Sequence, residues 1–163
     1  MSIFLKTEDE IELMREANLL VGKTLVEVGH HVKPGATTLQ LDKIAEEFIR
    51  DNGAIPTFKG FPSSYGPPFP GSICTSVNDV VVHGVPSEDV VLKDGDIISI
   101  DCGTLLNGFN GDSCYTFCVG EVSEDVKKLL RTTKESLYKG IEVAQAGHHV
   151  GDIGQVIQDY CQA

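Results

Sequence analysis

The chain alternates between stretches with helical periodicity and shorter apolar runs that are typical of strands. Two stretches open with the spacing of a capping box, Thr7 with Glu10 and Thr37 with Gln40, and continue with apolar residues at helical intervals. Two later stretches show the same helical period. The pattern therefore predicts four helices, over about residues 7–30, 37–52, 123–145 and 152–163.

Between the second and third of these helices, the apolar runs shorten and favour strands. TSVNDVVVHGVP, residues 75–86, predicts a strand, an Asn-Asp turn and a second apolar strand that ends at His83. DIISIDCGTLLNGFNGDSCYTFCVG, residues 96–120, predicts a β-hairpin, because Asn107-Gly108 suits the positive φ angles of a two-residue turn. The sequence therefore predicts an α+β fold with antiparallel strands.

Two aspartates lie inside the apolar strands of this hairpin. With Asn107-Gly108 as the turn, Asp101 faces Cys114 and Asp112 faces Gly103. Both carboxylates then lie on one face, with backbone positions about 7–8 Å apart. A carboxylate in such a strand is costly unless a cation neutralises it, so the pair predicts a site for divalent metal ions. The alternative is that Asp112 belongs to a second turn.

A proline-rich stretch, residues 58–74, precedes the strands and cannot form a regular element. It carries four aromatic residues: Phe58, Phe61, Tyr65 and Phe69. Two interpretations stay open, a rigid surface loop that packs on its own aromatics and one wall of a pocket. His83 is open in the same way, because a histidine at the mouth of a sheet serves either structure or catalysis.

Composition narrows the class of protein. The chain has 163 residues, of which 41% are hydrophobic and 23% charged, which fits one globular domain without a bilayer-spanning run. A net charge of −11 and a pI near 4.7 argue against a nucleic-acid-binding face. The five cysteines form no C-x-x-C pair, and the opening residues lack the pattern of a secretory signal. We therefore expect reduced thiols and a cytoplasmic protein with no membrane partner.

The helical pattern recurs within the chain. Its apolar anchors Leu41, Ile44, Ala45 and Phe48 return with the same spacing as Ile153, Val156, Ile157 and Tyr160. This predicts a first repeat over about 7–120 and the start of a second over about 121–163. The last helix, expected to open with a capping box of Asp152 and Gln155, reaches Ala163 without a stop signal. We expect the second set of strands to be missing from this sequence.

NDVVVHGVP and the run from LKDGDIISIDCG to the end of the hairpin closely resemble type I methionine aminopeptidases. The resemblance implies the pseudo-symmetric pita-bread fold, an antiparallel sheet covered by helices. It also implies that Asp101 and Asp112 are two of five ligands for a pair of divalent ions, Co, Mn, Fe or Zn. His83 would contact the substrate near the scissile peptide. Cys74 and Phe69 would form part of the wall around the methionine side chain.

The resemblance further implies a monovalent cation held by the loop at Asn78 and Val80. The substrate would be a peptide or nascent protein that begins with methionine. In that family the remaining ligands, one histidine and two glutamates, come from the second half, so we expect this chain alone to be inactive or nearly so. Two alternatives remain: a non-catalytic pita-bread binding module or self-associating half of a split assembly, and a prolidase-like relative. Cys74 and the aromatic loop favour an unbranched methionine side chain over the latter.

Overall fold

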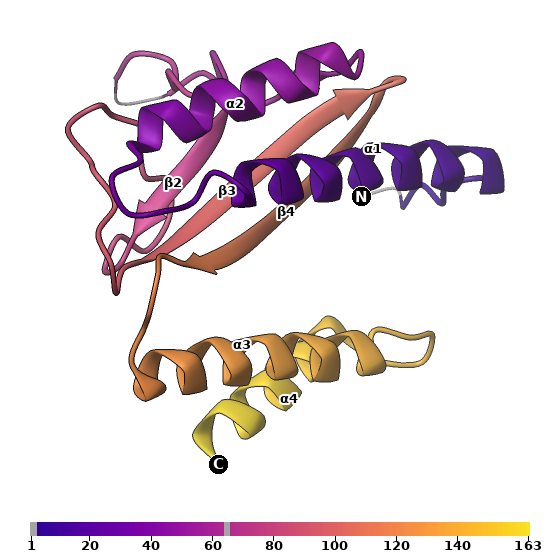
Figure 1. Ribbon diagram of the computed structural model, residues 1–163. Coiled ribbons are helices and arrows are strands. Elements are labelled where there is room, and N and C mark those ends of the chain that lie inside the picture. The colour runs from indigo at the N-terminus through magenta and orange to yellow at the C-terminus, as the bar shows by residue number, and fades with distance from the viewer. Residues whose placement is uncertain (1–2, 64–65) are drawn as a thin grey trace. The chain divides into compact units, whose positions relative to one another are not determined.

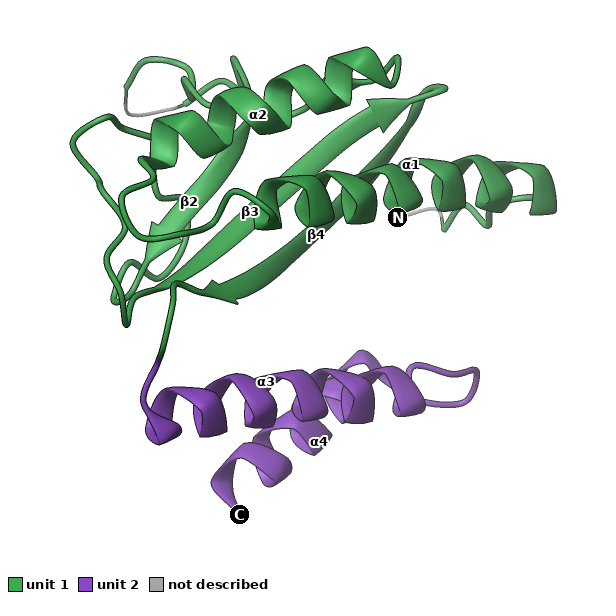
Figure 2. Ribbon diagram, in the orientation of Figure 1, with its two compact units in different colours: residues 1–121 green, residues 122–163 purple. Residues whose placement is uncertain are grey.

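The computed structural model describes residues 3–63 and 66–163. The chain forms two compact units, residues 1–121 and residues 122–163 (Figure 2). Within the described ranges, no helix is both long enough and apolar enough to cross a membrane. The predicted site residues all lie in the first unit.

The first unit is a small antiparallel sheet with two helices. Its elements are α1 (Glu8–Gly29), α2 (Thr38–Asp51), β1 (Ile55–Pro56), β2 (Ile73–Val77), β3 (Ile97–Leu106) and β4 (Phe109–Cys118). β3 pairs with β4 along its whole length, and β1 and β2 pair with successive parts of its other edge. Both helices pack on the same face of this sheet (Figure 1).

The first two helices begin where the sequence predicts. The Oγ1 of Thr7 accepts a hydrogen bond from the backbone N–H of Glu10 at 3.3 Å, and the Glu10 carboxylate accepts one from the N–H of Thr7 at 2.8 Å. Thr37 and Gln40 form the same reciprocal pair at the start of α2. The capping boxes predicted for α1 and α2 are therefore confirmed.

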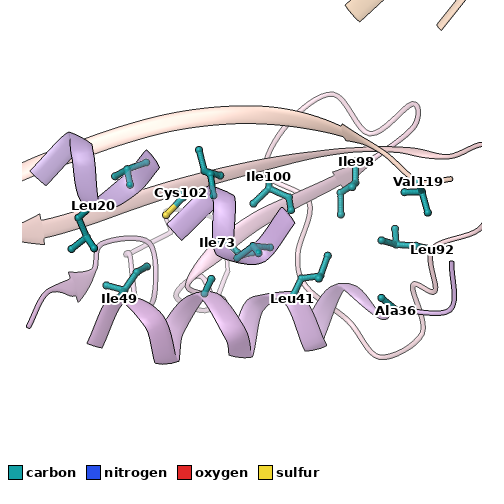
Figure 3. Packing of buried hydrophobic residues seen from close by; sticks show 14 of the residues in the cluster. Leu20, Ala36, Leu41, Ile49, Ile73, Leu92, Ile98, Ile100, Cys102 and Val119 are labelled. Atoms are coloured by element: carbon teal, nitrogen blue, oxygen red, sulfur yellow. The ribbon is translucent and has the colours of Figure 1, made fainter. Parts of the chain in front are cut away.

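The core lies between the helices and the sheet. Alternate residues of β3, namely Ile98, Ile100 and Cys102, are fully buried against α1 and α2. Leu20 and Leu41 meet them from the helices (Figure 3). Because successive side chains of a strand point to opposite faces, the intervening residues of β3 lie on the face away from the helices.

The second unit is a pair of helices, α3 (Glu124–Val143) and α4 (Val150–Gln162). A Cβ added to Gly140 of α3 would lie 3.0 Å from the side chain of Ile157, so the glycine lets α4 approach closely. The prediction that α4 opens with a capping box of Asp152 and Gln155 is wrong. His149 is the N-cap, and its N–H donates to the Asp152 carboxylate at 2.8 Å.

The predicted second apolar strand ending at His83 is also wrong. β2 ends at Val77, and residues 78–83 form turns and irregular chain. Asn78 and His83 have φ angles of 51° and 58°, which a continuous strand does not allow. Val81 is 87% exposed. An apolar run does not reveal whether a neighbouring strand is present to pair with it, and among the described residues this segment has none.

Candidate metal and substrate site

The predicted register of the hairpin is confirmed. Asp101 faces Cys114, and Gly103 faces Asp112. Asn107 and Gly108 form the turn with φ angles of 52° and 83°. Asp112 lies within β4, so the alternative that it belongs to a second turn is wrong. Both carboxylates are on the face of the sheet away from α1 and α2.

Ionisation of Asp101 is disfavoured at this site. Partial burial raises the pKa of Asp101 above its ordinary value, and the negative charge of Asp112 raises it further, while His83 opposes the shift. Two hard oxygen donors with unbalanced negative charge on one face are suited to a divalent cation.

Helix α1 holds the strand that carries Asp112. The Oδ1 of Asn18 accepts a hydrogen bond from the backbone N–H of Asp112 at 3.2 Å. The Oγ1 of Thr104 donates to the carbonyl of Ala17 at 3.1 Å. At Gly111, an added Cβ would lie 2.5 Å from that same carbonyl, so only glycine allows this approach. Sequence reasoning missed Asn18, since one asparagine within a helix carries no signal of a contact so distant along the chain.

His83 is held by the strand that precedes it. The N–H of Thr75 donates to the carbonyl of Gly84 at 2.8 Å, and the N–H of Gly84 donates to the Oγ of Ser76 at 3.2 Å. A Cβ at Gly84 would lie 2.1 Å from the carbonyl oxygen of Thr75. The His-Gly dipeptide is therefore pinned against β2, which maintains the left-handed backbone of His83.

A pocket of about 440 Å³ lies over the two aspartates. Its wall includes Phe58, Phe61, Phe69, Cys74, His83, Asp101 and Asp112. This arrangement favours the pocket-wall interpretation of the aromatic stretch, although Tyr65 lies outside the described residues. The ring of Phe58 occupies the space beside Gly103, where an added Cβ would lie 2.7 Å from its Cε1. The pocket wall thus combines aromatic side chains and a thiol with two carboxylates and an imidazole.

Cys74 belongs to the apolar part of this wall. It lies opposite Asp101 in the ladder and is 5% exposed. Burial and then the negative charge of Asp101 raise the pKa of its thiol to about 11. The thiol therefore stays neutral near pH 7 and behaves as a small apolar side chain.

The loop predicted to hold a monovalent cation has a defined structure of its own. The side-chain amide of Asn78 donates to the Asp96 carboxylate at 2.9 Å, and its Oδ1 accepts the N–H of Ile97 at 3.0 Å. The N–H of Val80 donates to the carbonyl of Val77 at 3.1 Å. These bonds close the turn, and its role in cation binding stays a prediction.

The donor set of the site is partial. Among the described residues, no group of three or more His, Cys, Asp or Glu side chains is placed to hold a metal ion. Asp101 and Asp112 fit a divalent ion by their chemistry and shared face, but two carboxylates do not complete a coordination sphere.

Comparison with known proteins places these features in a family. Residues 12–163 match the model of Metallopeptidase family M24. The chain is 49% identical over 161 residues to a methionine aminopeptidase of Clostridium acetobutylicum, and 51% identical over 160 residues to methionine aminopeptidase 1 of Bacillus subtilis. These alignments cover 99% and 98% of this chain but 62% of each relative.

A solved methionine aminopeptidase from Rickettsia prowazekii superposes with a TM-score of 0.93 at 40% identity, covering 99% of this chain and 62% of that one. The antiparallel sheet with its covering helices has the pita-bread architecture that the family resemblance implies. The chain therefore belongs to metallopeptidase family M24.

Proposed function

We propose that this chain takes part in removing the initiator methionine from peptides and nascent proteins by metal-assisted hydrolysis. One observation carries the proposal: a single pocket joins two carboxylates and an imidazole to an apolar wall. Such a pocket suits a substrate whose first side chain is apolar and whose reacting peptide bond lies beside metal ions. The names of the relatives agree with this chemistry.

Each part of the pocket has a distinct task. Asp101 and Asp112 hold the divalent ions, which would supply polarisation of the scissile carbonyl and a more acidic attacking water. His83 donates a hydrogen bond to the peptide as its carbon becomes tetrahedral. Phe69 and Cys74 take up the unbranched methionine side chain, for which an apolar wall with a soft sulfur atom is well suited.

We also propose which ions bind at the site and which ligands complete their coordination. Two divalent ions would be bound, and Co, Mn, Fe and Zn all tolerate carboxylate ligands, so availability decides among them. A monovalent cation would lie at the loop of Asn78 and Val80. The family resemblance implies that one histidine and two glutamates are the remaining ligands. The described residues do not provide them at this site. The isolated chain should therefore bind metal weakly and turn over little substrate.

The architecture and location follow from the same proposal. We infer one pita-bread domain with a first repeat over about 7–120 and the start of a second over about 121–163. We infer a protein of the cytoplasm, because its five cysteines are free thiols and reduced thiols are typical of that compartment.

Calorimetric titration of the chain with Met-Ala-Ser and with Ala-Pro, both in the presence of Mn²⁺, tests the substrate class. Met-Ala-Ser should bind in preference, and Phe69→Ala should weaken its binding more than that of Ala-Pro. Preference for Ala-Pro would instead support the prolidase-like alternative. Chromatography of the same mixtures should show little hydrolysis, and rapid turnover by the purified chain would contradict the claim of an incomplete donor set.

A second candidate function is a non-catalytic module that associates with itself. The exposed apolar segment after β2 favours it, since Val81 and Val82 are 87% and 61% exposed. Sedimentation velocity over a dilution series distinguishes the two. Reversible dimers that Val81→Ser abolishes would support the module, whereas a monomer at every concentration would exclude it.

A further inference from the structure

We propose that Asp42 and Glu46 of α2 are positioning residues that fasten two stems of the chain, residues 57–61 and 69–74, and so set the width of the apolar pocket. These stems carry Phe58, Phe69 and Cys74, which line it. The identity of the side chain that the pocket accepts rests on the proposed function, but the fastening itself does not.

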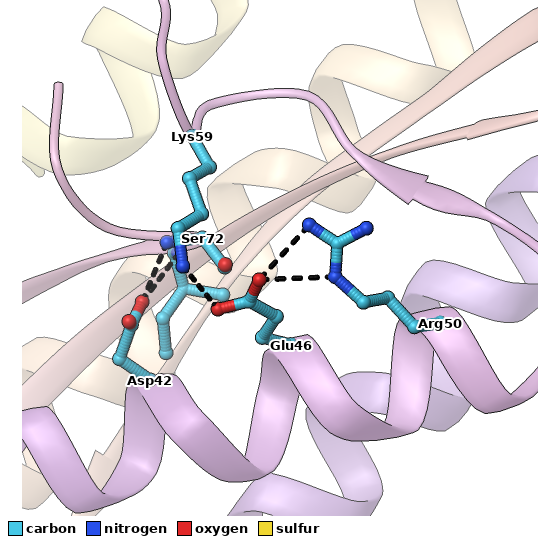
Figure 4. A network of polar contacts seen from close by, with 6 residues as sticks. Asp42, Glu46, Arg50, Lys59 and Ser72 are labelled. Atoms are coloured by element: carbon cyan, nitrogen blue, oxygen red, sulfur yellow. Dashed lines mark hydrogen bonds and ion pairs between the residues drawn. The ribbon is translucent and has the colours of Figure 1, made fainter. Parts of the chain in front are cut away.

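Glu46 holds the first stem. The ammonium group of Lys59 donates to the Oε2 of Glu46 at 2.5 Å, and the guanidinium group of Arg50 contacts Oε1 at 2.9 Å (Figure 4). Lys59 directly follows Phe58, whose ring lies beside Gly103 in the pocket floor. The Glu46 side chain is only 21% exposed. The Lys59 side chain is 42% exposed, so the pair lies near the surface and should contribute about 1 kcal/mol or less, but it fixes the residue next to the pocket wall.

Asp42 holds the second stem. Its Oδ1 accepts the backbone N–H of Ser72 at 2.6 Å and that of Ile73 at 3.0 Å (Figure 4). Asp42 is 4% exposed, and both N–H groups lie in buried residues. Loss of the carboxylate would leave two buried donors unsatisfied immediately before Cys74, which is costly.

The contacts of Asp42 and Glu46 with the two stems act together, and we call them the α2 bracket. Asp42 and Glu46 are four residues apart on α2 and therefore share one face of the helix. The stems are also bonded to each other, since the N–H of Gly60 donates to the carbonyl of Phe69 at 2.8 Å and the N–H of Phe69 donates to the carbonyl of Phe61 at 2.9 Å. Releasing either stem from α2 should therefore loosen the shared wall while the side chains of Asp101 and Asp112 stay unchanged.

The rate at which iodoacetamide labels Cys74 measures how far the pocket wall has loosened. Cys74 lies in the pocket wall, whereas Cys102 lies on the helix-covered face of the neighbouring strand and is fully buried. Both are free thiols. Peptide-resolved mass spectrometry after timed exposure to iodoacetamide reports each separately. Local opening exposes Cys74 alone, while global unfolding exposes both, so Cys102 is an internal control.

Matched variants isolate the bracket. Lys59→Met removes the tie to the first stem, while Arg50→Met removes the other partner of Glu46 and leaves the stem fastened. We expect Lys59→Met to label Cys74 about five-fold faster with Cys102 unchanged, and Arg50→Met to resemble the wild type. Asp42→Ala should raise the labelling rate of Cys74 about tenfold or more. Asp42→Asn keeps the acceptor oxygen, so it should retain most of the protection of Cys74 from labelling.

Other outcomes overturn the proposal. Equal effects of Lys59→Met and Arg50→Met, unchanged labelling of Cys74, or parallel acceleration of Cys74 and Cys102 would each show that the contacts do not position the pocket. Met-Ala-Ser affinity gives the functional readout: Lys59→Met should weaken peptide binding while leaving Mn²⁺ affinity unchanged. If the wild type does not bind this peptide, the proposed function fails, and the labelling result still decides the bracket.

Discussion

The two faces of β3 are built from alternate residues of one strand and have opposite properties. On the helix-covered face, Ile98, Ile100 and Cys102 are fully buried under α1 and α2. On the other face, here called the pocket face, Ser99 and Asp101 are only partly buried, and Asp101 lines the pocket. A spacing of one residue thus separates a close-packed core from a charged site.

The difference between the faces shows how the sheet tolerates a pair of carboxylates. The helix-covered face supplies the apolar burial that holds the hairpin together, so the pocket face does not have to contribute to it. The pocket face instead borders a cavity, whose wall includes Phe58 and Phe69 from the two stems and which leaves room for a ligand. Stability and chemistry should therefore respond separately to substitutions on the two faces.

The largest expected effect comes from the helix-covered face. Ile100→Ala should lower the free energy of unfolding by about 2–5 kcal/mol, because it deletes a fully buried side chain and leaves a cavity. Ser99→Ala, its neighbour on the pocket face, loses one hydroxyl contact with Thr116 and should cost about 1 kcal/mol or less. Urea denaturation measures both. Equal costs would mean that the two faces do not differ in this way.

A glycine on the pocket face should give the next largest effect. A Cβ at Gly103 would lie 2.3 Å from the Oγ1 of Thr57 and 2.7 Å from the Phe58 ring. Gly103→Ala should therefore cost about 1–3 kcal/mol and displace the ring from the pocket. Gly22→Ala, at a helical position with open space around it, is the matched control and should be neutral or stabilising by up to about 1 kcal/mol. A chemical-shift change at Phe58 that appears only in Gly103→Ala would sharpen the contrast.

The smallest effect concerns Asp96, which precedes β3 and belongs to neither face. Hydrogen bonds from the side chain of Asn78 and the N–H of Lys93 lower the pKa of Asp96 below its ordinary value of 3.8. The unfolded chain therefore binds the proton first on acidification, and the contribution of Asp96 to stability, present at neutral pH, is lost as the pH falls below about 4. As the pH is lowered, the midpoint temperature of thermal unfolding should fall more steeply in the wild type than in Asp96→Asn. Parallel curves would contradict this.

The sequence predicts the local structure of the site well. The hairpin register, the shared face of Asp101 and Asp112 and both capping boxes depend on neighbouring residues or on one two-residue turn. The strand predicted to end at His83 is wrong because an apolar run does not show whether a partner strand exists. The predicted start of α4 is wrong because Asp152 fits two capping registers, and only the structure distinguishes them.

The long-range contacts that hold the site residues in place could not be predicted from local sequence. Asn18 reaches Asp112, and Asp42 reaches Ser72, across long separations in sequence. In a helix, each of these polar residues is equally compatible with an exposed position. Their contacts arise from how α1 and α2 pack on the sheet, which no local pattern encodes.

Binding of Mn²⁺ to the pocket face tests the central claim most directly. Paramagnetic broadening of backbone amide signals should centre on Asp101 and Asp112 and extend to His83 in the wild type. Asp101→Asn and Asp112→Asn should each weaken Mn²⁺ affinity by about tenfold or more, because each removes a negative charge next to the ion, while Asp96→Asn should not. Broadening centred elsewhere, or equal affinity in all three variants, would contradict the assignment of the two aspartates as a metal site.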